Sequence, residues 1–157
     1  MNKNNLNFEL VLANSNLLAQ KNVDSILACN ESTEKYGLIL NEKQALAILK
    51  TRSKALEETK RLEFSTTIID DLILTFCDSS YITKNDYEDT IHELIVLFYE
   101  LKNNTWDTIS DTELINFMKK AFESSCYGSL ELLSGTLLRF IEHIHLGKSI
   151  KTFRLEE

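Results

Sequence analysis

The sequence predicts an all-α protein, and three observations support that fold class. Apolar residues recur at steps of three and four through nearly the whole chain, as they do along one face of a helix. No segment alternates between apolar and polar residues with a period of two, and no hairpin signal is present. The 157 residues include no proline, so the predicted helices can run without kinks. We expect one helical domain over residues 1–157, with frayed ends at 1–6 and 148–157.

Capping residues divide the first part of the chain into three predicted helices. A short first helix is expected over residues 7–18. Asp24 is a good N-cap for a second helix, which ends at Gly37 in a left-handed turn. After a short extended link, Asn41 and Gln44 form a capping box that opens a third helix, which is expected to end near Arg61.

Four further helices are predicted, and each begins at a residue whose side chain can accept a hydrogen bond from the first helical turn. The predicted N-caps of the first three are Ser65, Asn85 and Ser110, and the last helix is expected to start near Ser129. The helix that starts at Asn85 is apolar over more than half of its circumference, so we expect it to be the central one. The last helix stops at Gly147.

The predicted helix starts recur at a regular interval. Alternate starts lie 42 to 45 residues apart, close to the length of a helix pair in an α-solenoid. Three helical hairpins packed into one bundle would give the same spacing. No residue motif recurs with the interval. We therefore predict a single-domain bundle of six to seven helices, with a short α-solenoid of three helix pairs as the alternative.

The charge of the chain is negative and unevenly distributed. Its formal net charge is −7, and binding to nucleic acid requires a basic face that displaces counterions, so no nucleic-acid partner is expected. Residues 66–115 carry eleven acids and two bases, whereas residues 41–61 carry six bases and three acids. These two regions could attract each other within one molecule or between two molecules.

The cysteines and the apolar runs indicate a cytoplasmic protein. Cys29, Cys77 and Cys126 are far apart and lack C-x-x-C spacing, which predicts free, buried and inert thiols rather than disulfides, a zinc site or a nucleophile. The N-terminal residues contain no apolar run of the length that a signal peptide needs. The longest apolar run, Leu94 to Tyr99, is too short to span a bilayer, so no membrane partner is expected.

Two of the three histidines lie close together, in the stretch RFIEHIHLG. On a helix His143 and His145 point about 160° apart, so they cannot share a metal ion. Glu142 and His145 do face the same way, as do Asp89 and His92, and such pairs form part of the ligand set of di-iron bundles. Asp89 falls on the polar side of its helix. The preferred interpretation is boundary histidines with ordinary hydrogen bonds, and the alternative is a metal site of Asp89, His92, Glu142 and His145.

Arg52 lies in the middle of the apolar stripe of its predicted helix. A guanidinium that faces inward needs a partner, because an isolated buried charge is very costly. If the second and third helices pair as an antiparallel hairpin, Arg52 can meet Glu34, and Asn30 borders the same stripe. Asn30, Glu34 and Arg52 are therefore candidates for a polar pocket that binds a small anionic or amide-bearing ligand. A structural ion pair, or a guanidinium that reaches water, is the preferred interpretation.

No catalytic residues and no cofactor are predicted, because the chain lacks a glycine-rich phosphate loop and an organised reactive centre. Apolar residues outside the main stripes could form an exposed contact surface; they are Leu74, Val96, Leu132 and Leu146. The preferred hypothesis is a non-enzymatic interaction or scaffold module, whose partner is another protein or a second copy of the chain. The alternative is a helical bundle that binds a small ligand or a metal through an inward polar cluster.

Three stretches of the sequence resemble a family of small proteins from Gram-positive bacteria that is described as a domain of unknown function. They read ILACNESTEKYGLILNEKQA, LILTFCDSSYITKNDY and YGSLELLSG. The similarity extends from Ile26 to Gly135, and it includes Asn30, Glu34, Gly37, Arg52, Phe76, Cys77, Asp78 and Gly128. The family has a proline after the first serine that follows Asp78, where this chain has Ser80. The resemblance implies a helical, cytoplasmic, bacterial protein and implies no activity.

Overall fold

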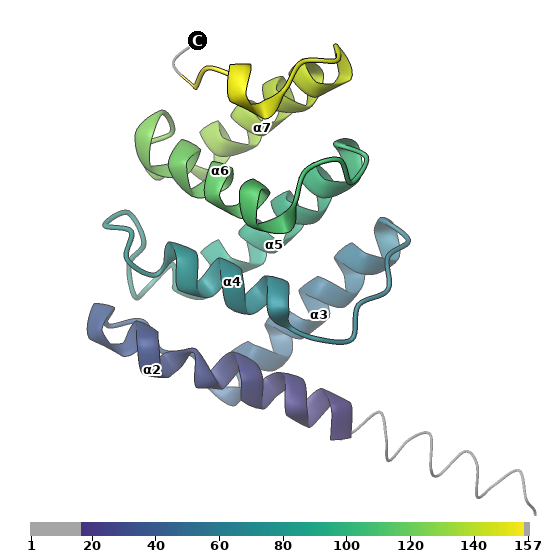
Figure 1. Cartoon of the computed structure of the whole chain (residues 1–157). Coiled ribbons are helices and arrows are strands. Elements are labelled where there is room, and N and C mark those ends of the chain that lie inside the picture. Colours follow the sequence, from purple (N-terminus) through teal and green to yellow (C-terminus); the bar gives the residue numbers. More distant parts are fainter. Residues whose placement is uncertain (1–16, 156–157) are drawn as a thin grey trace, which may run out of the picture.

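The structure, a computed structural model, describes residues 17–155, and the regular structure in this range is entirely helical (Figure 1). This finding confirms the all-α prediction. Residues 17–28 are helical, and the elements that follow are α2 (Asn30–Thr33), η1 (Glu34–Tyr36), α3 (Glu42–Glu58), α4 (Thr67–Phe76), α5 (Tyr87–Asn104), α6 (Asp111–Ser124), α7 (Leu130–His145) and η2 (Ile150–Thr152). The helix predicted over 7–18 lies almost wholly outside the described residues.

The helices are stacked as successive pairs. In Figure 1, α2, α4 and α6 form one layer and α3, α5 and α7 form the other. Each helix contacts its counterpart in the next pair, as α3 does with α5 and α4 with α6. The helix α5 contacts α3, α4, α6 and α7, which confirms its central position. The chain thus forms one all-α unit, and within it the pairs are arranged as in the solenoid alternative.

One continuous hydrophobic core runs through the stack. Every helix contributes side chains that are fully buried, because its apolar stripe faces the neighbouring pairs. Examples, in chain order, are Ile26, Ile48, Phe76, Phe98, Phe122 and Phe140. The rings of Phe76 and Phe122 meet edge to face with centroids 5.5 Å apart, and they join α4 to α6. This core fixes the relative positions of the helices that line the site described below.

Two predicted N-caps are confirmed, and the last helix starts where it was expected, after Ser129. Asn41 accepts a hydrogen bond from the Gln44 backbone N–H at 2.8 Å, and the Gln44 side chain accepts one from the Asn41 N–H at 2.9 Å, which completes the capping box. Ser110 and Ser129 cap α6 and α7 by accepting hydrogen bonds from the third residue beyond them. Gly37 has φ of +75°, as its predicted left-handed turn requires.

Three other predicted N-caps are wrong. Asp24 lies inside the helix over 17–28, where it accepts a hydrogen bond from Gln20 at 2.9 Å, one turn earlier on the exposed face. Asn85 is replaced at the start of α5 by Asp86, whose carboxylate accepts a hydrogen bond from the Thr83 N–H. The helix α4 begins at Thr67, and its N-cap is Thr66 rather than Ser65.

The three helices of one layer end in the same way. In α3, α5 and α7 the second residue after the helix adopts a left-handed conformation. The φ angles are +55° at Lys60, +55° at Trp106 and +81° at Gly147. The next N–H donates to a carbonyl five residues earlier, in the Schellman pattern. These bonds are Arg61 to Leu56, Asp107 to Lys102 and Lys148 to His143. A structural repeat therefore exists although the residue types differ.

The C-terminal segment packs on the last helix pair. After Gly147, Ser149 precedes the single turn η2, at the place where earlier pairs begin a full helix. The ring of Phe153 then contacts Phe117 of α6 at 5.7 Å and Phe140 of α7 at 5.2 Å between centroids. The sequence predicted a frayed end here. Residues 148–155 instead form a short ordered segment that packs on α6 and α7 and covers the end of the core.

Candidate functional site

The layer made of α3, α5 and α7 carries a surface groove of about 690 Å3. We call it the acidic groove, and its lining residues are Thr51, Lys54, Ala55, Glu58, His92, Glu93, Val96, Leu97, Glu100, Leu130, Glu131 and Ser134. On each helix these residues recur at steps of one turn, on the side that faces away from the core stripe. The stacking of α3 on α5 and of α5 on α7 brings the three faces together.

The acidic groove has an apolar floor and a negative rim. Ala55, Val96, Leu97 and Leu130 supply the apolar surface, and Val96 is 38% exposed. The rim carries Glu58, Glu93, Glu100 and Glu131 against one lysine. That lysine, Lys54, lies 4.0 Å from Glu58 in a well-exposed pair, so it neutralises little of the charge. The groove therefore combines a surface that excludes water with an excess of negative charge.

His92 links two walls of the groove through a chain of hydrogen bonds. Its Nε2 lies 2.9 Å from the Glu88 carboxylate, and its Nδ1 lies 2.6 Å from the Thr51 hydroxyl. A carboxylate accepts and does not donate, so Nε2–H donates to Glu88, and Nδ1 and the Thr51 hydroxyl share the second hydrogen bond. The chain ties α5 to α3 and fixes the orientation of the imidazole.

The Thr51–His92–Glu88 chain has the order of a nucleophile, base and carboxylate, but its position does not suit hydrolysis. Thr51 lies in the interior of α3, where the neighbouring backbone N–H groups are used within the helix. A nucleophile of this kind needs free N–H donors beside it to stabilise an oxyanion. The arrangement is therefore best interpreted as a structural tie beneath the groove.

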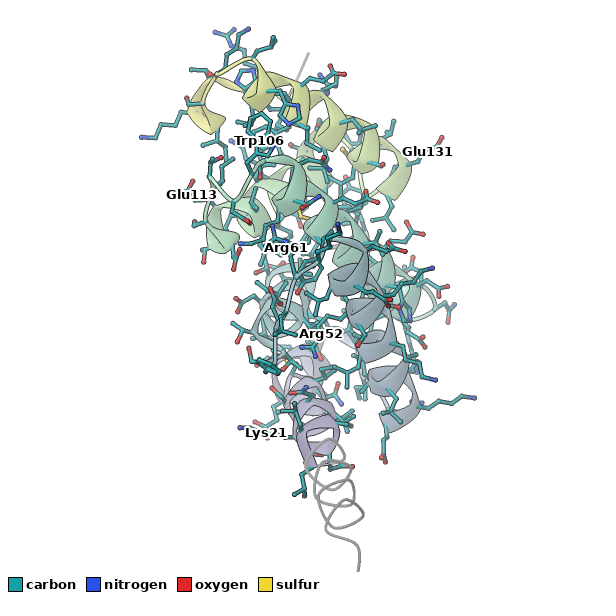
Figure 2. The ribbon with its side chains drawn as sticks, turned by 90° about the vertical axis from the view of Figure 1, so that its right-hand side faces the viewer. Lys21, Arg52, Arg61, Trp106, Glu113 and Glu131 are labelled. Atoms are coloured by element: carbon teal, nitrogen blue, oxygen red, sulfur yellow. The ribbon has the colours of Figure 1, made fainter. Side chains whose placement is uncertain are left out.

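Arg52 lies among the buried residues of α3 and is itself buried, at 7% exposure. Its Nη1 donates to the backbone carbonyl of Ser65, and its Nε has no partner within residues 17–155. The link after α3 folds back across the guanidinium, so Arg52 fastens this link rather than meeting Glu34. Figure 2 shows Arg52 below Arg61, on the side where the links between the pairs lie.

Asn30 and Glu34 do not join Arg52 in a common cluster. Asn30 donates from Nδ2 to the Leu40 carbonyl and accepts from the Leu40 N–H, both at 2.9 Å. This pair of bonds holds the link between η1 and α3. Glu34 is exposed in η1. The three predicted pocket residues are therefore distributed over two separate local structures, and a ligand-binding role for them stays a prediction.

The residues of the alternative metal site are turned towards other partners. His92 makes the contacts given above, and His145 donates from Nε2 to the Asn104 carbonyl at 2.6 Å. The His145 ring also stacks on Trp106, with centroids 4.3 Å apart and planes 11° from parallel. Within residues 17–155 no three His, Cys, Asp or Glu side chains are grouped so that they could hold a metal ion, and Asp89 and Glu142 are exposed.

The three cysteines are buried and free. Burial, reinforced by the Asp70 carboxylate beside it, raises the pKa of Cys29 to about 12. Burial also raises the pKa of the Cys77 thiol. A raised pKa keeps a thiol protonated at neutral pH, which is the opposite of what a nucleophilic cysteine requires.

Sequence reasoning identified little of the acidic groove. Val96 stood out as apolar and outside the main stripe, and it does lie on the floor. The rim residues of α3 and α5 were not among the predicted site residues. A usable signal exists in hindsight: Val96 has Glu93 three residues before it and Glu100 four residues after it, on the same face. Leu132 is exposed beside a different hollow, and Leu74 and Leu146 are exposed elsewhere.

Comparisons with known proteins establish the family of the chain. No curated protein and no solved structure matches it. None of the helices within 17–155 combines the length and the apolar character that crossing a membrane requires. The model of one protein family matches residues 25–150, which is most of the chain and spans all the stacked pairs. The chain belongs to this family, the family of unknown function DUF6323.

Proposed function

We propose that the chain is a non-enzymatic interaction module, and that its acidic groove binds a basic amphipathic segment of a partner protein. One observation carries this proposal: a partly exposed apolar floor lies between four glutamates, three of which have no counterion among the described residues. Side chains of Glu93, Glu100 and Glu131 make no hydrogen bond or ion pair with another described residue. Their charge is therefore available to a partner.

The shape of the groove suits a helix or an extended segment. Stacked helix pairs commonly bind partners along the surface that one layer forms, because that surface is continuous over several repeats. A bound amphipathic helix would place apolar side chains at steps of one turn on Val96, Leu97 and Leu130. Lysine or arginine side chains on its flanks would then reach the glutamates of the rim. Three free, buried thiols support the predicted cytoplasmic setting for such a complex.

The proposal is tested with a labelled helical peptide in which leucines form one face and lysines flank it, using fluorescence anisotropy. The matched probe carries glutamate in place of each lysine. We expect saturable binding of the basic peptide, weaker binding at high salt, and no binding of the acidic peptide.

Charge-reversal variants locate the site. The double variant Glu93→Lys/Glu100→Lys is expected to weaken peptide binding by about tenfold or more. Its control, Glu34→Lys/Glu57→Lys, makes the same change in net charge at exposed residues that do not line the groove, and it should bind like the unmodified chain. Equal losses in both variants would show a general charge effect and would count against the groove.

A further inference from the structure

A second concavity lies at the C-terminal end of the stack and has the opposite charge. It has a volume of about 1600 Å3 and is formed by α6, α7 and the segment after Gly147. We call it the basic hollow. Four of its lining residues are cationic, namely Lys120, Arg139, Lys151 and Arg154, and two are acidic, namely Glu113 and Glu131. Figure 2 shows Glu113 and Glu131 on opposite sides of the molecule.

Three of the four cations of the basic hollow lack a counterion among the described residues. The side chains of Lys120, Lys151 and Arg154 make no hydrogen bond or ion pair with any residue in 17–155. They surround apolar surface supplied by Phe117, Leu132 and Phe153. Because the whole chain has a net charge of −7, an unpaired positive surface of this kind is a local exception that fits a negatively charged partner.

The same chain carries a surface that complements the basic hollow. The acidic groove has an apolar floor and three glutamates without a counterion in 17–155, and the basic hollow has apolar residues and three cations of the same kind. The two surfaces also adjoin, because Glu131 at the start of α7 lines both. Adjacent patches of opposite charge on one molecule can satisfy each other in a two-fold pair, where each patch of one copy contacts the other patch of its partner.

We infer that the partner of the acidic groove is a second copy of this chain, whose basic hollow docks on it. This inference rests on the proposed function, since it assigns an occupant to the same groove. In the pair, Lys151 and Arg154 of one copy lie against Glu93 and Glu100 of the other. The reciprocal contact forms at the same time, so the assembly closes as a dimer.

The experiment is sedimentation velocity on the full chain and on two charge-reversed variants. Variant one, Glu93→Lys/Glu100→Lys, makes the groove basic, and variant two, Lys151→Glu/Arg154→Glu, makes the hollow acidic. We expect the unmodified chain to dimerise at about 100 μM and each variant alone to associate at least tenfold more weakly, because like charges then face each other. An equal mixture of the two variants should dimerise again, since each surface meets its complement.

Restoration by mixing is the decisive result, because two misfolded variants could not produce it. Circular dichroism and the thermal midpoint of each variant show whether it is folded. The inference is overturned if the unmodified chain stays monomeric at this concentration. It is also overturned if both variants are folded and their mixture stays monomeric. If the chain is monomeric and yet binds the basic peptide, the proposed function stands and its partner is a different protein. Failure of both assays removes both proposals.

Discussion

Tyr81 lies directly against the backbone of Gly128. A Cβ atom placed on Gly128 would approach the Cβ and Cγ atoms of Tyr81 to 2.4 Å, and the φ angle of Gly128 is +78°. The contact joins the link after α4 to the turn before α7, two segments that α5 and α6 separate in the chain. The close approach leaves no room for a side chain at this position, and the left-handed backbone adds to the cost of one.

The variant Gly128→Ala is therefore expected to lower the free energy of unfolding by about 2 kcal/mol or more, through steric overlap and left-handed strain together. Urea denaturation followed by circular dichroism measures this change. The control is Gly135→Ala inside α7, where an added Cβ meets nothing within 4 Å. That variant should be stabilised by up to about 1 kcal/mol, because alanine is the better helix former. Equal effects at the two glycines would contradict this account of Gly128.

Lys60, in the turn after α3, has a left-handed backbone conformation. This conformation is energetically unfavourable for any residue that carries a side chain. Glycine adopts this conformation without strain, so Lys60→Gly is expected to raise the thermal midpoint, by an amount equivalent to about 0.5–1 kcal/mol. The control Lys50→Gly changes an exposed lysine inside α3 and should destabilise by about 1 kcal/mol. A loss of stability in Lys60→Gly would mean that its side chain contributes more than its backbone strain.

Asn30 is expected to contribute to stability, because the nitrogen and the oxygen of its side-chain amide both form hydrogen bonds with the Leu40 backbone. Asn30→Ala leaves the Leu40 N–H and C=O without these partners and should cost about 1–3 kcal/mol. Asn116→Ala is the control, since Asn116 is an exposed residue within α6 and should change stability by less than about 0.5 kcal/mol. Chemical denaturation of the two variants side by side decides the point. An Asn30→Ala chain of unchanged stability would reopen the ligand-binding interpretation of this residue.

Stability should fall as the pH rises above about 9. Burial raises the pKa of Cys29 from 9.0 to about 12, and that of Tyr87 from 10.0 to about 12. Burial and the nearby Glu63 also raise the pKa of Tyr99. Above pH 9 the unfolded chain releases these protons and the folded chain retains them, so the unfolded state binds fewer protons and the free energy of unfolding decreases.

The contribution of these groups is fully present below pH 9 and is lost between pH 9 and 12. Thermal midpoints measured across this range should show the decline, and Cys29→Ala should make it shallower because one of the titrating groups is gone. A midpoint that stays constant up to pH 11 would show that Cys29 and Tyr87 are open to solvent.

Features encoded by a single helical turn could be predicted from the sequence. These features depend on residues within a few positions of each other, and they are the Asn41 capping box, the Ser110 and Ser129 caps and the left-handed Gly37. Asp24 was misplaced because a good capping residue can also lie on the exposed face of a longer helix, and propensity alone does not separate the two. The interval between helix starts was visible, but the shared helix ends were not, because Lys60, Trp106 and Gly147 have nothing in common except their backbone conformation.

The candidate site was harder to predict, because it depends on distances between helices. Arg52 was recognised as unusual, but its partner is a backbone carbonyl in the following link. Every residue has such a carbonyl, so the residue types give no indication of this partner. The acidic groove joins residues of α3, α5 and α7 that are separated by tens of positions in the chain. Only the stacking of the pairs shows that Glu58, Glu93 and Glu131 border the same floor.

The turn η2 and Phe153 cover the apolar surface of the last helix pair. Were the polypeptide cut after Gly147, the rings of Phe117 and Phe140 would lose the ring that packs on them. The newly wet face would have the shape that accepts another helix pair, and such faces make repeat proteins insoluble unless a terminal element closes them. Phe153 thus shields the apolar surface that α6 and α7 present at this face from water.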